Sequence, residues 1–269
     1  AHHYSEARVP EKAIPLWKQA ADHASKAWAT AEAVGHLERA LGLVQELADP
    51  VEKSGQELPL LQEYIAALRI LDRYPEALKA LDQAEEIAAS AADNESLAHI
   101  HYMRGNIHFP MGDIDGCLEE HQAAQQFARL AASPEMEARA FSGLGDAWFM
   151  RGQLATARDR FHDCLEIVER HGLKEIEPVN RAMYAHAQLY MLQMDEAREN
   201  VLAAIEQARA GKNIRAEMVA RGSCAGKIFF DCGEYAEARR QSDLAIEIAG
   251  RIGNRRFEVV NMAIVAQID

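Results

Sequence analysis

The stretch "LGDAWFMRGQLATARDRF", residues 144–161, contains the pattern that decides the fold. In its first half, apolar residues such as Leu144 and Trp148 lie three and four positions apart, which places them on one face of a helix. A glycine-containing turn follows, and Ala157 and Phe161 then share one face of a second helix. The stretch therefore predicts two helices joined by a short turn, which is a helical hairpin.

The same pattern recurs along the chain at a nearly constant interval. Each copy begins with a small residue, here called the anchor. Four positions after the anchor most copies have a bulkier residue, and seven positions after it comes a second small residue. The anchors are Ala77, Cys117, Ala157, Ala197 and Ala238, at spacings of 40, 40, 40 and 41. Because a fixed period of this kind is typical of stacked supersecondary units, we expect an all-α solenoid of antiparallel helix hairpins.

These repeats predict the organisation of the whole chain. Residues 1–50 are predicted to form an N-terminal helical hairpin region with a truncated first helix, helices at about 11–28 and 31–47, and a loop at 48–59. Residues 51–269 are predicted to form the repeats, at about 57–90, 96–131, 135–171, 178–210 and 215–252, with a truncated last helix at 255–269. Because both ends fall inside predicted helices, we interpret the chain as a piece of a longer protein.

The hairpin pattern resembles the tetratricopeptide repeat (TPR). The matching residues of the clearest copy are Leu144, Gly145, Trp148, Ala157, Phe161 and Cys164. The period of about 40 differs from the family's period of about 34 and is similar to the longer-helix variety of bacterial transcription activators and kinesin light chain. The resemblance implies a right-handed superhelix of six to seven hairpins, in which the first helix of each hairpin lines a concave binding face.

A narrower resemblance covers "AHHYSEARVPEKAIPLWKQAADHA" at 1–24 and "RGNIHFPMGDIDGCLEEH" at 104–121. Both segments look like the C-terminal TPR region of large bacterial signalling proteins that carry a nucleotide cyclase domain and an ATPase domain. The resemblance implies a parent protein of that type. It also implies that the upstream catalytic and ATPase domains are candidate partners, beside a separate protein or peptide.

The charge and the cysteines exclude several classes of protein. A formal net charge of −13 argues against nucleic-acid and anionic membrane partners, which both require clustered Lys and Arg. No apolar run approaches the ~20 residues that a membrane-spanning helix needs. The four cysteines show no CxxC spacing, which favours a reduced, cytoplasmic protein.

Two segments look like chemical sites, but both fit the repeat. In "GDIDGCLEEH", at 112–121, Cys117 takes the place of an anchor and His121 takes the place of Phe161. In "GSCAGKI", at 222–228, only three residues separate the glycines and Ile228 follows the lysine, so the segment departs from a phosphate-binding P-loop. We therefore expect no catalytic residue, no metal, no cofactor and no enzymatic activity.

A row of polar and aromatic residues recurs on the first helix of each hairpin. Offsets of 15, 11 and 8 residues before the anchor share one helical face, which differs from the Leu144–Trp148 packing face. The candidate binding residues are Tyr102, Asn106, Phe109, Arg139, Asp146, Phe149, His186, Lys227 and Phe230. We expect this row to bind a peptide or protein segment in the concave groove, as part of an interaction or regulatory scaffold module of a signalling protein.

Individual members of this row predict how binding would work. The charges of Asp146 and Lys227 would orient the segment, and His186, with an ordinary pKa near 6.5, would make binding depend on pH. Two alternatives remain open at this point. The polar residues are merely solvated while the aromatic residues pack between hairpins, or the domain is a small-molecule sensor with its ligand inside the superhelix.

Overall fold

The computed structural model describes residues 1–27 and 29–269. Trp28, at the end of the helix predicted at 11–28, lies outside the described residues. Throughout the described part of the chain every regular element is a helix. The elements are α1 (His2–Glu6), α2 (Pro10–Lys26), α3 (Thr30–Val44), α4 (Pro50–Ile70), α5 (Tyr74–Ser90), α6 (Asn94–Met111), α7 (Ile114–Leu130), α8 (Pro134–Met150), α9 (Leu154–His171), α10 (Glu177–Tyr190), α11 (Met194–Ala210), α12 (Ile214–Val219), the π-helical segment η1 (Ala220–Gly226), α13 (Lys227–Asp231), α14 (Tyr235–Arg251) and α15 (Arg255–Ile268).

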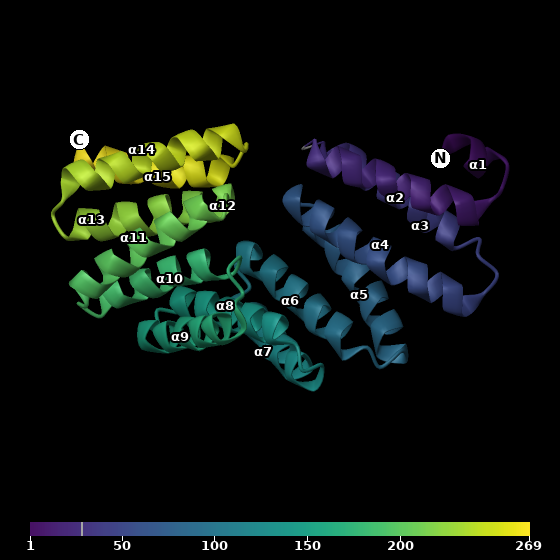
Figure 1. The fold of residues 1–269 in the computed structure, drawn as a ribbon, viewed down its shortest axis with the longest axis horizontal. Coiled ribbons are helices and arrows are strands. Elements are labelled where there is room, and N and C mark those ends of the chain that lie inside the picture. Colours follow the sequence, from purple (N-terminus) through teal and green to yellow (C-terminus); the bar gives the residue numbers. More distant parts are fainter. Residues whose placement is uncertain (28) are drawn as a thin grey trace. The chain divides into compact units, whose positions relative to one another are not determined.

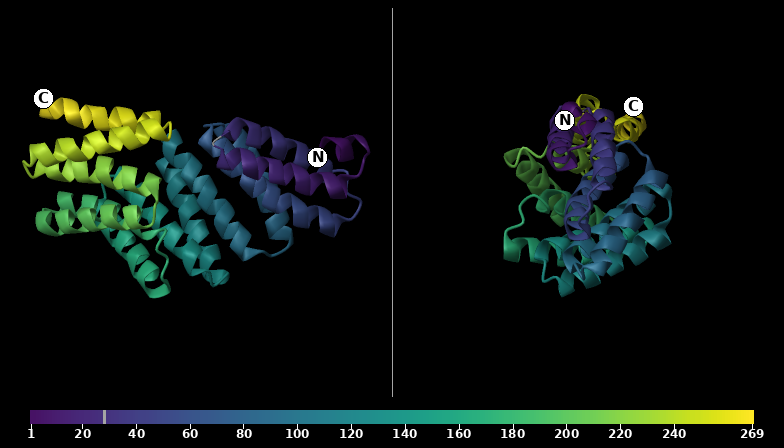
Figure 2. Two further views of the ribbon diagram at one scale, coloured as in Figure 1. Left: turned by 45° about the horizontal axis from the view of Figure 1, so that its top comes forward. Right: turned by 90° about the vertical axis from the view of Figure 1, so that its right-hand side faces the viewer.

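The helices belong to two compact units. Unit 1 comprises Ala1–Asp113 and Gln126–Ala131, and unit 2 comprises Ile114–Gln125 and Ala132–Asp269. Within each unit, consecutive helices pack side by side and antiparallel, as α2 and α3 do in unit 1 and α14 and α15 do in unit 2 (Figure 1). The same pairs can be followed from two other directions in Figure 2. The all-α fold of helix hairpins that the repeat predicts is therefore confirmed.

The loop predicted at 48–59 is largely helical, so this prediction is wrong. Helix α4 begins at Pro50, where the ring fits the first turn of a helix and no amide donor is needed. The Asp49 side chain caps the helix by accepting a hydrogen bond from the Val51 amide at 3.0 Å. Pro59 lies inside α4, and the buried apolar residues that follow it pack in unit 1 and offset the lost backbone hydrogen bond.

From α4 to α14, each repeat helix ends with one residue in the left-handed backbone conformation. These residues are Asp72, Ala92, Gly112, Ala132, Gly152, Gly172, Leu192, Lys212, Gly233 and Gly253. They recur every 20 residues, except for one interval of 21, so each repeat consists of two half-repeats of nearly equal length. The amide after the left-handed residue closes the helix end, as the Gln153 N–H does by donating to the Trp148 carbonyl at 3.0 Å.

The anchors lie at the closest contacts between helices. All five are 0% exposed, and so is Phe161, four residues after the third anchor. Phe161 packs against Gly145 of α8 so closely that a Cβ atom added to Gly145 would lie 2.5 Å from the Phe161 ring. Ser242 and Gly226 make the same contact in the last complete hairpin, at 2.6 Å from the added Cβ to Oγ. A small residue on the first helix therefore leaves space for the side chain that lies four positions after the anchor on the second helix.

A second contact of this type joins neighbouring hairpins in unit 2. His121 of α7 is 1% exposed, and its ring lies directly against Gly143 of α8. Burial lowers the pKa of His121 to about 4, so this side chain is neutral at physiological pH. His121 is thus a packing residue in the position that Phe161 occupies in the next hairpin, as the repeat predicts.

The one longer interval in the repeat coincides with a π-helical segment. The left-handed residues Lys212 and Gly233 are 21 positions apart, and η1 (Ala220–Gly226) lies between them. A π-helical turn accommodates one extra residue within an otherwise regular helix. The 41-residue spacing of the last anchors is therefore an insertion in the first helix of that hairpin.

We predict that Gly145→Ala destabilises unit 2 by about 1–3 kcal/mol, because the added methyl group overlaps the buried Phe161 ring. The matched control is Gly250→Ala in α14, where an added Cβ meets nothing within 4 Å. This change should stabilise the helix by up to about 1 kcal/mol, since alanine has the higher helix propensity. Urea denaturation followed by circular dichroism measures both effects, and equal effects of the two changes would contradict the proposed contact.

We also predict that Leu192→Gly raises the free energy of unfolding by up to about 1 kcal/mol. Leu192 has φ +61° and is 79% exposed, so glycine relieves backbone strain at little cost in packing. The reciprocal change, Gly152→Ala at φ +72°, should be destabilising, although nothing lies within 4 Å of the added Cβ. A destabilised Leu192→Gly variant in the same denaturation assay would show that the turn does not carry this strain.

Candidate binding site

The predicted row of binding residues is divided between the two units, and its larger part lies in unit 2. Asp146 and Phe149 lie on α8, His186 lies on α10, and Lys227 and Phe230 lie on α13. All five side chains are half-buried. We call these residues, together with Tyr190 of α10, the first-helix face of unit 2.

Aromatic rings join α8 and α10 on this face. The Phe149 ring centroid lies 5.0 Å from that of His186 and 6.0 Å from that of Tyr190, and the last two rings are 5.4 Å apart. Tyr190 is 45% exposed and is missing from the predicted row, because it lies seven residues before its anchor, an offset that the row does not contain. The exposed residues Ile70 and Met150 also lie seven positions before their anchors. This recurrence of exposed apolar residues is the sequence pattern from which Tyr190 could have been predicted.

Asp146 has no ion-pair or hydrogen-bond partner among the described residues. Burial raises the pKa of its carboxyl group to about 7, because the surrounding protein solvates the charge poorly. Burial, with the Asp146 charge as a second cause, also raises the pKa values of Cys164 and Cys224 to about 12, so both thiols stay protonated. Asp146 is therefore an uncompensated carboxyl group, which a cation or a hydrogen-bond donor would stabilise.

His186 cannot supply the pH dependence that the sequence suggests. Burial, reinforced by the Lys227 charge, lowers the pKa of His186 to about 4. Its ring is therefore neutral above pH ~5, and the buried Nε2 atom has no hydrogen-bond partner among the described residues. The group on this face that titrates near neutral pH is Asp146 instead.

Lys227 is not a free charge either. Its ammonium group lies 2.6 and 2.7 Å from the two carboxylate oxygens of Asp231, one turn later on α13, and 5.6 Å from the Phe230 ring centroid. The charge of Lys227, which the sequence predicts would help to orient a bound segment, is therefore compensated within α13. The surrounding segment 222–228 is η1 and the start of α13, and it lacks the strand-to-helix turn of a P-loop.

The other predicted residues lie on α6 and at an earlier position of α8. Tyr102, Asn106 and Phe109 lie on α6 of unit 1, where all three are half-buried. The buried Nδ2 atom of Asn106 has no hydrogen-bond partner among the residues described, so the amide remains able to donate. Arg139 lies on α8, and its guanidinium pairs with Glu135 one turn earlier at 2.8 Å.

Among the described residues, no group of three or more His, Cys, Asp or Glu side chains is placed to hold a metal ion. Within the same residues, none of the helices combines the length and the apolar character needed to cross a bilayer.

Comparison with known proteins identifies the class of fold. No protein-family model matches the sequence, and no curated protein matches it. Solved structures do match: a Rap protein complexed with Competence and Sporulation Factor is 14% identical, with a TM-score of 0.69 over 95% of this chain and 74% of that chain. The Rap conjugation gene regulator of the plasmid pLS20, in complex with a Phr peptide, is 13% identical, with a TM-score of 0.68 over 100% and 77%.

A third match is a Signal Transduction ATPase with Numerous Domains protein from Pyrococcus horikoshii, which has a tetratricopeptide repeat sensor. It is 17% identical, with a TM-score of 0.64 over 97% of this chain and 41% of that protein. At these identities the matches define the fold alone. The chain is thus an all-α helical repeat protein with a TPR-like fold, as the resemblance of its hairpins implies.

We predict that Asp146→Asn stabilises unit 2 at pH 7.5 but not at pH 4. In the unfolded chain the carboxyl group ionises near its ordinary pKa of 3.8, whereas in the folded chain it keeps its proton up to about pH 7. Unfolding therefore releases a proton between these pH values, and the free energy of unfolding falls as the pH rises through them. The asparagine variant avoids this loss, which amounts to at most about 4 kcal/mol at 1.4 kcal/mol per pKa unit.

The measurement is urea denaturation of the wild-type chain and the variant between pH 4 and 8. His121 and His186 act in the opposite direction between about pH 4 and 6.5, because their lowered pKa values make the stability rise with pH. Because both histidines are present in the wild type and in Asp146→Asn, their contribution cancels when the free energies of unfolding of the two are subtracted. Asp195→Asn, at an exposed carboxylate of unit 2, is the control, and a pH-independent difference for Asp146→Asn would refute the raised pKa.

Proposed function

We propose that this chain is a regulatory interaction module that binds a peptide segment on the first-helix face of unit 2. The observation that carries the proposal is the uncompensated Asp146 carboxyl group one turn before Phe149 on α8, whose ring contacts those of His186 and Tyr190. A structural carboxyl group in this environment is normally paired, since an isolated buried charge is costly. A ligand with a cationic group and an apolar side chain could pair with the Asp146 carboxylate and pack against the aromatic rings at the same time.

The other groups on this face suit a peptide better than a simple ion. The His186 ring is neutral, so it contributes aromatic surface and no charge to this face. The half-buried aromatic rings supply contact area with few rotatable bonds, as anchor residues of interfaces do. Within the face, Lys227 is paired with Asp231 and keeps the part formed by α13 polar.

The structural neighbours support a regulatory role of this kind. One of them is in complex with a peptide, and another carries a tetratricopeptide repeat sensor within a signalling ATPase. The further proposal is that this module belongs to a bacterial signalling protein and transmits the bound state of unit 2 to other domains of that protein. The four free cysteines support action in the reducing cytoplasm. In this proposal the role of the chain is binding, and the chemistry belongs to its partners.

The test is a selection of peptides from a displayed random library on the intact chain, followed by titration of the enriched peptides. We predict that Phe149→Ala weakens a peptide bound at this face by at least about 2 kcal/mol, because the ring is a central anchor. Tyr184→Ala is the control, since Tyr184 lies on α10 but stacks on His162 of α9 at 5.9 Å instead. Equal affinity of every selected peptide for the wild type and for Phe149→Ala would exclude this face as the site.

The same peptides give a pH test. Those with a basic residue should bind up to about 10-fold more tightly at pH 8 than at pH 6, because a cation binds the ionised form of Asp146. His186 stays neutral over this range and adds nothing to the change. Asp146→Asn should abolish the pH dependence, whereas a pH dependence that persists in this variant would assign it to another group.

A further inference from the structure

Three turns of unit 2 concentrate positive charge in a chain that is acidic as a whole. They join α9 to α10, α11 to α12 and α14 to α15, and their sequences are "RHGLK" at 170–174, "RAGKNIR" at 209–215 and "RIGNRR" at 251–256. Together they contain eight Lys and Arg residues and no Asp or Glu, although Asp and Glu outnumber Lys and Arg by 42 to 29 in the whole chain. All eight of these residues are exposed.

The three turns lie at the same end of the helices of unit 2. Because consecutive helices are antiparallel, every second turn falls at one end, and the α10–α11 and α13–α14 turns lie at the other (Figure 1). The left-handed residues Gly172, Lys212 and Gly253 recur at intervals of 40 and 41, so the turns occupy equivalent places in successive hairpins. We call the eight cations of these turns the basic edge: Arg170, Lys174, Arg209, Lys212, Arg215, Arg251, Arg255 and Arg256.

The cations of the basic edge differ from the other cations of unit 2 in their ion pairs. Every Lys or Arg of unit 2 outside the edge pairs with a carboxylate, as the following residues do: Arg139, Arg151, Arg158, Arg160, Arg181, Arg198, Arg221, Lys227, Arg239 and Arg240. On the edge, Arg209 pairs with Glu217 at 3.9 Å and Arg255 pairs with Glu258 at 2.8 Å. The other six cations have no ion-pair partner among the described residues. The unpaired positive charge of unit 2 is therefore confined to one end of its helices.

The carboxylates that flank the basic edge bear on the kind of anion that fits it. Each turn is followed closely by a glutamate, in order Glu175, Glu217 and Glu258. A nucleic acid carries a phosphate on every nucleotide, so its evenly spaced charges would meet these glutamates as well as the cations. A protein segment can place Asp or Glu opposite the cations and uncharged residues opposite the glutamates. The arrangement therefore favours an acidic protein segment over a nucleic acid.

The remaining side chains of the three turns favour the same partner. None of them is Phe, Tyr or Trp, whereas proteins that bind single-stranded nucleic acid stack the bases on aromatic rings. The large apolar residues of the turns, Leu173, Ile214 and Ile252, are half-buried. They are therefore not available to insert into a membrane surface, which interfacial binding normally requires in addition to positive charge.

We propose that the basic edge of unit 2 binds an acidic protein segment, rich in Asp and Glu, as a second surface separate from the first-helix face. Carboxylates of the segment pair with the six cations that lack a partner in the chain, and arginine can form two parallel hydrogen bonds to one carboxylate. Each turn supplies two or three cations, so a segment that pairs with more than three must extend over at least two hairpins. Because all of these cations are exposed, the affinity falls as the salt concentration rises.

The variant Lys212→Gly separates binding from stability. Lys212 has φ +53°, so glycine relieves backbone strain and at the same time removes one cation of the edge. The matched control is Leu192→Gly, which makes the same backbone change at φ +61° at the opposite end of the helices and removes no charge. Neither variant should lower the free energy of unfolding, and only Lys212→Gly should bind an acidic segment more weakly.

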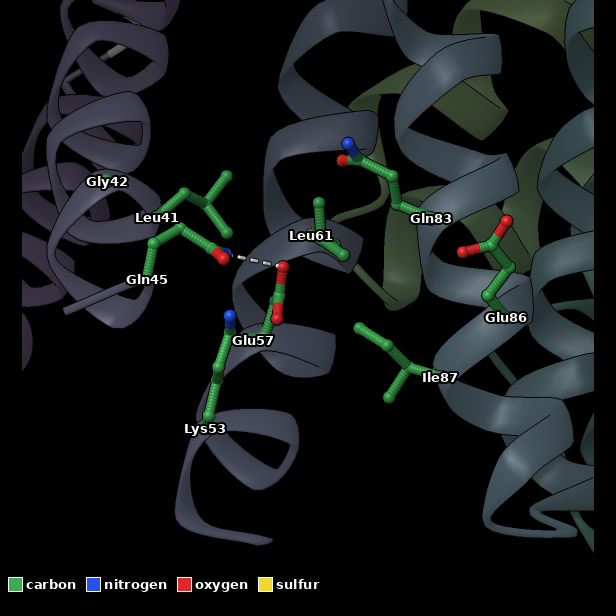
Figure 3. Close-up of a pocket in the computed structure, with 9 residues that line it drawn as sticks. All are labelled: Leu41, Gly42, Gln45, Lys53, Glu57, Leu61, Gln83, Glu86 and Ile87. Carbon is green, nitrogen blue, oxygen red and sulfur yellow. Dashed lines mark hydrogen bonds between the residues drawn. The ribbon is translucent and has the colours of Figure 1, made fainter. Parts of the chain in front are cut away.

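A second pair of variants controls for the net charge. The double variant Arg215→Ser/Arg256→Ser removes two unpaired cations from different turns of the edge. The control Lys53→Ser/Lys79→Ser removes the same charge from unit 1, where Lys53 lines a hollow of about 520 Å³ together with Glu57 and Glu86 (Figure 3). A difference in affinity between the two double variants therefore reports on the position of the cations and not on the total charge.

The probe is a fluorescein-labelled peptide of alternating Glu and Ser, with about 20 residues, which at about 3.3 Å per residue is long enough to extend over several hairpins. Fluorescence anisotropy measures its affinity for the intact chain at low and at high salt. We expect a loss of about 3-fold for Lys212→Gly and about 10-fold for Arg215→Ser/Arg256→Ser, because an exposed ion pair contributes up to about 1 kcal/mol. Both control variants should bind like the wild type.

Oligothymidylate and vesicles that contain phosphatidylserine are titrated in parallel under the same conditions. The proposal is overturned if the peptide does not bind at low salt, or if the two double variants lose affinity for it equally. Tighter binding of oligothymidylate or of the vesicles than of the peptide, lost in Arg215→Ser/Arg256→Ser, would instead assign the basic edge to a nucleic acid or to a membrane.

Discussion

The contact between a small residue of one helix and the central side chain of the next is the constraint on which the rest of the structure depends. Phe161 is fully buried only because Gly145 has no side chain, and Ser242 relies on Gly226 in the same way. Once these two hairpins close through this contact, their first helices present the opposite face outward. The positions of Asp146 and Phe149 on one face of α8 are consequences of that closure.

Much of this arrangement could be predicted from the sequence, because the residues that form the contact recur at a regular interval. The anchors, the residues four positions later and the turns all repeat with the interval of a structural unit, so the repeat alone assigns Cys117 and His121 to packing. The limits are also physical. Gly55 and Pro59 weaken the helical pattern of α4, and only the tertiary packing of the residues that follow Pro59 makes the helix stable.

The chemistry of the candidate site depends on surroundings that no local pattern contains. The repeat identifies Asp146, His186 and Lys227 as charged or titratable members of one row, but it predicts the wrong behaviour for His186 and Lys227. Burial keeps the His186 ring neutral, and Asp231 neutralises Lys227 one turn later on the same helix. The second of these could have been predicted, since residues four apart on a helix are neighbours.

The extra residue absorbed by η1 has a consequence for how such chains diverge. A helix that accepts one residue through a π-helical turn keeps the partners at both of its ends, while the side chains on either side of the turn rotate relative to each other. One hairpin of a repeat protein can therefore present different side chains on its surface after the insertion of a single residue, with no substitution in the neighbouring hairpins. Alignments that impose a constant period on the repeats would score this event as a loss of similarity, although the packing on both sides is intact.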